Sequence, residues 1–310
     1  MNRFSLILFL LISATVFAQY SSRDLSTSPY VDGTLLLPDA IDKPPLAIII
    51  AGSGPTDRNG NSQMARNNSL KLLAEGLASK GIAVFRYDKR ILKQIKDRTL
   101  DESSIRFSQF VEDAQGVVKY FNKANAFSSI TVIGHSQGSL VGMLACPQGA
   151  NGMVSLAGAG EPIDSVILEQ LQAQAPGLVE DASLAFSTLR ETGSVSGYNP
   201  GLESLLRPQI QPFMLSWMVA DPTAAISALD IPVLIVTGDK DLNVAVDQAE
   251  KLQSAKPNSQ LLVIEGMNHV LRKIEGDDYD NGKSYDDPTL PVMPELIDAI
   301  AAFVQNLESK

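Results

Sequence analysis

The stretch Ile130–Ala145, ITVIGHSQGSLVGMLA, joins a strand pattern to a helix pattern through one sharp turn. The turn is GHSQG (134–138), with Ser136 at its centre. So sharp a turn strains the backbone of its central residue, and only small residues fit two positions before and two positions after it. A serine held in this way projects above the sheet, at a helix N-terminus that favours negative charge. The pattern predicts that Ser136 is a nucleophile, provided that the rest of the chain supplies its partners.

Other apolar runs of strand length precede and follow this one. They are continuous rather than alternating, which is typical of strands buried on both faces of a parallel sheet. Helical spacing lies between several of them, so we expect a mostly parallel α/β sheet with helices on both faces. The expected core strands are 46–50, 82–88, 128–134, 152–158, 231–238 and 259–266, with an edge strand at 30–38, and the expected helices cover 70–77, 107–121 and 296–304.

One long segment breaks the alternation of strands and helices. Residues 161–230 contain helical patterns separated by Pro and Gly and no convincing strand. We expect a helical cap or lid at the sheet edge where α/β proteins bind ligands, although ordinary helical packing remains the alternative. The expected core is then 19–160 together with 231–310.

A nucleophilic serine needs a base and an acid that orients the base. Of the two histidines, His135 is adjacent to Ser136 and should point away from it, packing beneath the turn. His269 follows the last expected strand and is the predicted base. Asp241, in the loop after strand 231–238, is the predicted acid, while Asp239 would shape the turn. The order serine, acid, base along the chain fits a nucleophile elbow on an α/β sheet.

The oxyanion of an acyl-transfer reaction needs two fixed donors. The backbone N–H of Gln137, directly after the nucleophile, is one candidate. The other is the backbone N–H of Ser53, in the loop AGSGPTDRNGN after the first core strand, where flanking glycines let the backbone approach. In the same loop, Asp57 and Arg58 are expected to hold the loop by pairing, with substrate binding as the alternative.

Residues 1–18 predict a cleaved signal peptide: Arg3, a short apolar run, and a small-residue end at Ala18. A membrane anchor is the alternative, but the run is short for a bilayer. Export to the periplasm or the exterior follows, with no stable membrane insertion after cleavage. The net charge of −10 argues against nucleic acid as a partner. One cysteine, Cys146, and two histidines exclude the usual zinc sites, and no metal site is expected.

The motifs AGSGPTDRNGN, RYDKR, GHSQG, TGDKDLNV and GMNHVL together resemble the α/β-hydrolase superfamily, and within it bacterial carboxylesterases with a Gly-Ser-Gly-Pro oxyanion loop. The resemblance implies the α/β-hydrolase fold and hydrolysis of small carboxylic esters through an acyl-enzyme, without a cofactor. This chain departs from many such proteins at Ala51, where they have His, and at 91–93, where they have a glycine-containing loop.

The same triad could cleave amides or thioesters, so peptidase and thioesterase activities remain alternatives. A non-catalytic exported binding protein on a hydrolase scaffold is a further alternative, since fold alone does not establish function. The sequence leaves the acyl chain length and the oligomeric state open.

Overall fold

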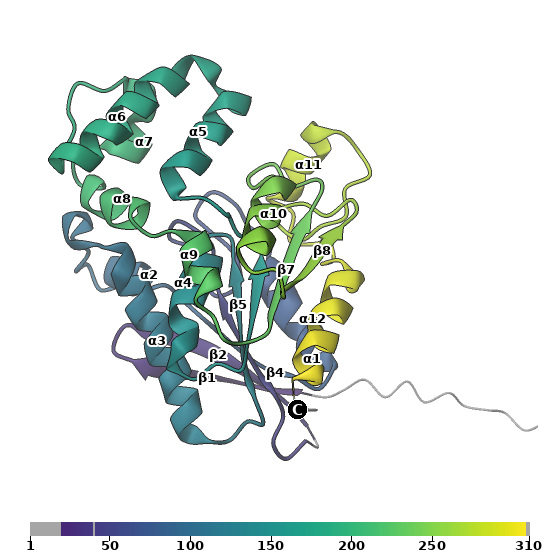
Figure 1. The fold of residues 1–310 in the computed structure, drawn as a ribbon. Helices are drawn as coiled ribbons and strands as arrows, with labels where there is room; N and C mark the ends of the chain where they lie inside the picture. The colour runs from purple at the N-terminus through teal and green to yellow at the C-terminus, as the bar shows by residue number, and fades with distance from the viewer. Residues whose placement is uncertain (1–19, 40, 308–310) are drawn as a thin grey trace, which may run out of the picture.

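The computed structural model describes residues 20–39 and 41–307, and the predicted signal peptide lies outside them. Eight strands of the described chain form one sheet in the order β1-β2-β4-β3-β5-β6-β7-β8 (Figure 1). The strands are β1 (Tyr20–Ser28), β2 (Val31–Pro38), β3 (Leu46–Ile50), β4 (Ala83–Tyr87), β5 (Ile130–His135), β6 (Gly152–Leu156), β7 (Val233–Gly238) and β8 (Gln260–Ile264).

Strands β4, β3, β5, β6, β7 and β8 pair in parallel, and β2 joins β4 antiparallel. The prediction of a mostly parallel sheet is confirmed. The sequence did not predict β1, which pairs antiparallel with β2 and forms the edge of the sheet. Most of its residues are exposed or half-buried, so its polar sequence YSSRDLSTS lacks an apolar run.

Helices cover both faces of the sheet, as predicted. One apolar core places α1 and α12 against one face, and a second places α3, α4, α9 and α10 against the other. The helices are α1 (Ser69–Ser79), α2 (Arg90–Lys96), α3 (Phe107–Ala124), α4 (Gln137–Ala145), α5 (Ile163–Gln174), α6 (Val179–Thr192), α7 (Glu203–Leu206), α8 (Gln211–Met218), α9 (Pro222–Ser227), α10 (Val246–Ala255), α11 (Asp278–Ser284) and α12 (Pro294–Asn306).

The connection from β6 to β7 is a helical insertion, residues 163–227, that contains α5 to α9. Figure 1 shows α5 to α8 grouped together at the top of the view, beyond one end of the sheet. They share a small apolar core of their own, which includes Phe186, Leu189 and Met214. The last helix, α9, instead buries Ile226 in the core of the sheet.

The carboxyl ends of the parallel strands meet at one edge of the sheet, which is where α/β proteins place their ligand sites. The loops that leave β3, β5, β7 and β8 at this edge carry every residue predicted to act in catalysis or to bind the oxyanion. No helix in the described part of the chain has the length and apolarity needed to cross a membrane.

Candidate active site

The turn between β5 and α4 has the strained geometry that its sequence predicts. Ser136 has φ 55° and ψ −123°, outside the regions that L-residues usually adopt. A Cβ at Gly134 would lie 2.2 Å from the carbonyl oxygen of Gly138, and a Cβ at Gly138 would lie 2.3 Å from that of Ile50. Only glycine therefore fits at either position, and the turn presents Ser136 above the sheet edge.

His269 and Asp241 come together from separate loops. The loop after β7 carries Asp241, the loop after β8 carries His269, and the Nδ1 of His269 lies 2.7 Å from Oδ2 of Asp241. The other carboxylate oxygen, Oδ1, accepts hydrogen bonds from the backbone N–H groups of Asn243 (2.7 Å) and Val244 (2.9 Å). Burial alone would raise the pKa of Asp241, but His269 and the two N–H groups outweigh it and hold this pKa below its usual value. Asp241 is therefore an ionised, fixed acceptor for the imidazole.

The neighbouring carboxylates have other roles. Asp239 accepts a hydrogen bond from the backbone N–H of Gly266 at 2.6 Å, which ties the loop after β7 to the loop after β8. Asp247 lies on α10 and pairs with Lys251 at 3.0 Å. The structure thus brings Asp241, rather than either neighbour, to the histidine.

His135 lies beneath the turn and is 8% exposed. Its Nε2 is 2.8 Å from the carbonyl oxygen of His269, so the ring donates Nε2–H to that carbonyl. Burial and the nearby ring of His269 lower the pKa of His135 to about 4. His135 therefore stays neutral and anchors the backbone of His269 to the nucleophile turn.

This buried histidine makes a testable contribution to the pH dependence of stability. The unfolded chain protonates His135 near its ordinary pKa of 6.5, and the folded protein only near 4. Folding favours neutral His135, so its contribution to the free energy of unfolding is complete above pH 6.5. This contribution falls by about 3 kcal/mol as the pH drops to 4. In urea unfolding at pH 7.0 and pH 4.5, His135→Gln should lose less stability than wild type between the two pH values. An equal loss in both proteins would contradict this assignment.

A cavity of about 510 Å³ opens over Ser136 and His269. Its floor includes Ser53, Gln137 and Leu140, and its far wall comes from the helical insertion. The wall was not predicted residue by residue, because the apolar positions of α5 and α8 look like ordinary helix-packing residues in the sequence. Those that face the cavity are mainly apolar: Ile163, Val166 and Ile167 from α5, and Phe213, Met214 and Trp217 from α8.

The two predicted oxyanion donors also lie at this cavity. A Cβ at Gly52 would be 3.2 Å from the Cβ of Ser136, so the loop after β3 runs directly against the nucleophile. Ser53 follows on this loop, and its carbonyl accepts a hydrogen bond from Thr56 Oγ1 at 2.8 Å. Gln137 is the first residue of α4. The backbone of both residues therefore borders the space in front of Ser136.

The charged pair in the loop after β3 was partly mispredicted. Arg58 binds Asp88, with its Nη2 2.6 Å from Oδ2, and not Asp57. Asp57 instead accepts hydrogen bonds from the backbone N–H groups of Asn59 and Asn61. Both side chains hold the loop as expected, but through other partners.

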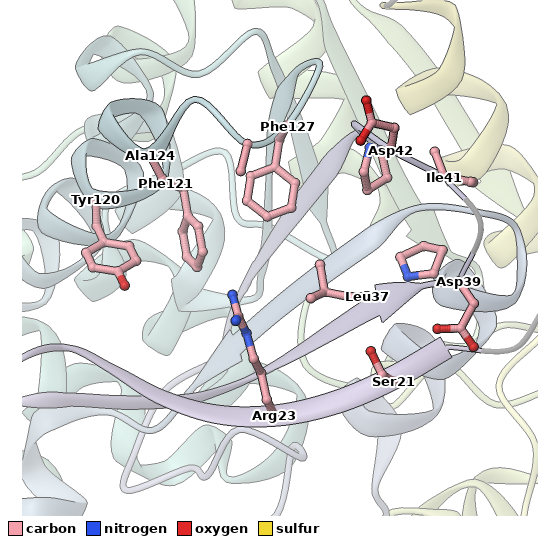
Figure 2. A pocket seen from close by; sticks show the side chains of 13 residues that line it. Ser21, Arg23, Leu37, Asp39, Ile41, Asp42, Tyr120, Phe121, Ala124 and Phe127 are labelled. Atoms are coloured by element: carbon pink, nitrogen blue, oxygen red, sulfur yellow. The ribbon is translucent and has the colours of Figure 1, made fainter.

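A second cavity, of about 470 Å³, lies between β1 and the end of α3 (Figure 2). Arg23 from β1 faces Phe121 and Phe127 across it. Both histidines of the chain lie elsewhere, so no histidine lines this space to form a pair like that of His269 and Asp241. We therefore place the candidate active site in the cavity over Ser136.

Comparisons with known proteins identify similar chains. A family model described as serine aminopeptidase, S33, matches residues 66–199. The esterase EstD of Thermotoga maritima is 28% identical over 272 residues, which are 83% of this chain and 61% of EstD. The chain thus spans less than two thirds of the length of this curated relative.

Solved structures show the same fold. Est1E from Butyrivibrio proteoclasticus superposes with a TM-score of 0.59 at 18% identity, over 93% of this chain and 99% of Est1E. The esterase PF2001 of Pyrococcus furiosus gives a TM-score of 0.53 at 16% identity, over 93% and 91% of the two chains. At these identities the likeness concerns the fold alone.

Proposed function

We propose that this chain, which has the α/β-hydrolase fold, is a serine hydrolase that cleaves carboxylic esters. The observation that carries the proposal is the strained Ser136 sharing one cavity with His269, whose other ring nitrogen is held by Asp241. These three groups fit the roles of nucleophile, base and orienting acid.

The reaction follows from these positions. Ser136 Oγ attacks the ester carbonyl while Nε2 of His269 takes its proton, and Asp241 stabilises the imidazolium through Nδ1–H. The backbone N–H groups of Gln137 and Ser53 donate to the oxyanion of the tetrahedral intermediate. Its collapse expels the alcohol, which receives the proton from His269. Water then attacks the acyl group on Ser136 by the same route and releases the carboxylic acid.

The cavity favours a neutral, apolar substrate. Its wall in the helical insertion is mainly aliphatic and aromatic, and no lysine or arginine is found among its described lining residues. The acidic side chain in the lining, Glu161, pairs with Lys251, which also pairs with Asp247 and Glu169, and it accepts a hydrogen bond from Gln248 at 2.8 Å. We infer that the insertion acts as a cap that encloses the acyl or alcohol group of the ester.

The esterase relative EstD supports an ester substrate, and Est1E has been solved with bound ferulic acid. Ester hydrolysis is therefore the function that the site supports best.

The proposal predicts how turnover depends on the acyl group. For p-nitrophenyl esters, kcat/KM should rise up to about fourfold per methylene while the chain still fits, since each buried methylene contributes about 0.8 kcal/mol. The monoanionic glutarate ester should react at least about tenfold more slowly than the pentanoate, because its carboxylate replaces a methyl group without finding a cation.

Initial rates from acetate to palmitate, with aminoacyl p-nitroanilides and acyl thioesters in parallel, provide the measurement. Faster cleavage of the anilides or thioesters than of every ester would replace the esterase with one of those activities. No turnover of any of them would favour the binding protein.

A further inference from the structure

A buried lysine lies directly behind the candidate oxyanion site. Lys89 follows β4 and is 5% exposed. Its Nζ donates a hydrogen bond to Oε1 of Gln137 at 2.7 Å and lies 4.9 Å from the centre of the Phe110 ring. Lys89 also borders a space of only about 10 Å³ together with Ile50 and Ala51, which end β3 and begin the oxyanion loop. One side chain therefore contacts Gln137 and borders the same space as the start of the oxyanion loop.

The ammonium of Lys89 has no ion-pair partner among the residues that the structure describes. Asp113 borders the same small space, but Arg90 binds its two carboxylate oxygens at 2.7 Å each. Burial without a counter-charge lowers the pKa of Lys89 to about 7. Such a group costs stability compared with an apolar side chain of the same shape. Core packing alone is therefore a poor explanation for a lysine at this position.

Gln137 has its side chain fixed by this contact. The amide oxygen of Gln137 faces Lys89 and accepts the hydrogen bond from its Nζ. The amide nitrogen of Gln137 is buried and has no hydrogen-bond partner among the described residues. The contact with Lys89 therefore holds the side chain of Gln137. The backbone N–H of the same residue is the proposed oxyanion donor.

We propose that Lys89 is a positioning residue for the oxyanion hole, which fixes Gln137 through its amide oxygen. The inference rests on the proposed serine hydrolase function. The oxyanion carries a full charge only in the tetrahedral state, so a backbone donor that Lys89 holds in place through Gln137 stabilises the transition state more than the bound ester. Its removal should lower kcat and leave ester binding nearly unchanged.

The main test replaces Lys89 with methionine, which keeps the length of the side chain and removes its charge and donors. A direct oxyanion donor contributes about 10²–10³ in kcat, and a group that acts through another should contribute less. We expect Lys89→Met to lower kcat about 10- to 100-fold with KM within about threefold of wild type. Lys89→Gln keeps a neutral donor toward Gln137 and should give an intermediate kcat, even if the methionine variant fails to fold.

Lys256 provides a matched control. It is also a buried lysine, 7% exposed, and its Nζ donates to the carbonyl oxygen of Leu229 at 2.6 Å, away from the cavity. Lys256→Met should change the melting temperature and leave kcat within about threefold of wild type. A purely structural role for Lys89 would make its variants behave in the same way.

Ground-state binding can be followed separately, because Trp217 is the single tryptophan of the chain and lines the cavity. Quenching of its fluorescence by a slowly reacting ester in the Ser136→Ala background gives a dissociation constant. Adding Lys89→Met should change this constant by less than about threefold. A loss of binding that matches the loss of kcat/KM would overturn the proposal.

The outcomes separate this inference from the proposed function. If wild type hydrolyses esters and the folded Lys89 variants keep kcat within about threefold, the positioning role is wrong and the esterase stands. If wild type hydrolyses no ester, the proposed esterase function is wrong. The rate at which a fluorophosphonate labels Ser136 then tests the positioning role of Lys89. Labelling slowed at least tenfold in Lys89→Met but not in Lys256→Met supports the role, and equal or absent labelling overturns it.

Discussion

Replacing Ser136 with alanine is expected to lower kcat for a p-nitrophenyl ester by a factor on the order of 10⁴ to 10⁶. The variant loses the oxygen that forms the acyl-enzyme, and only the oxyanion donors and the cavity remain to assist attack by water. Ester binding should persist, because the apolar wall of the cavity is untouched. Initial rates at saturating ester, with protein checked by circular dichroism, provide the measurement.

Ser139 supplies the matched control for this substitution. It lies one turn further along α4, is 1% exposed, and its Oγ lies 2.7 Å from Oγ of Ser155. Ser139→Ala should cost about 1 kcal/mol of stability through the lost hydrogen bond and leave kcat within about threefold. More than a tenth of wild-type activity in Ser136→Ala, or an equal loss in both variants, would contradict the role of Ser136.

Replacing Asp241 with asparagine is expected to lower kcat about 10³- to 10⁴-fold. In wild type, Oδ1 of Asp241 accepts hydrogen bonds from the backbone N–H groups of Asn243 and Val244. The single amide oxygen of the asparagine can take over this role. The group facing Nδ1 of His269 would then be an NH₂, which donates and so selects the tautomer with its proton on Nε2. That tautomer cannot accept the proton of Ser136, and the imidazolium loses its counter-charge.

Asp239→Asn is the comparison for the acid, since Asp239 lies two residues away and holds the backbone of Gly266. This variant should keep kcat within about tenfold, because its amide oxygen can still accept the same hydrogen bond. Rates for both variants between pH 6 and pH 9 test the difference. A larger effect at Asp239 than at Asp241 would mean that the acid has been assigned to the wrong residue.

The catalytic edge of the molecule was predictable because its signals are local. Continuous apolar runs marked β3 to β8, and the glycines of GHSQG marked the sharp turn, because a Cβ at Gly134 or Gly138 would meet a backbone oxygen there. Asp241 and His269 follow directly after strands, and parallel topology brings strand ends to one edge. Residues 130 apart in the chain could therefore be placed together from the sequence.

Other features depend on tertiary contacts that leave no periodic signal. The edge strand β1 is polar because few of its residues are buried, so it lacks the pattern of a core strand. The partner of Arg58 is Asp88, which lies at the end of a different strand. Lys89 looks like one more basic residue in RYDKR, and only the fold shows that it is buried against Gln137. The orientation of the helical insertion is likewise set by packing between helices.

Mass spectrometry after reaction with a fluorophosphonate tests the central claim most directly, because the probe reports the nucleophile without assuming a substrate. The account predicts one phosphonyl adduct per chain, located on the peptide that carries Ser136. The adduct should be lost in Ser136→Ala and form at least about 10²-fold more slowly in His269→Ala. An adduct on another serine, or no adduct on the folded wild-type protein, would contradict the assignment of Ser136 as an activated nucleophile.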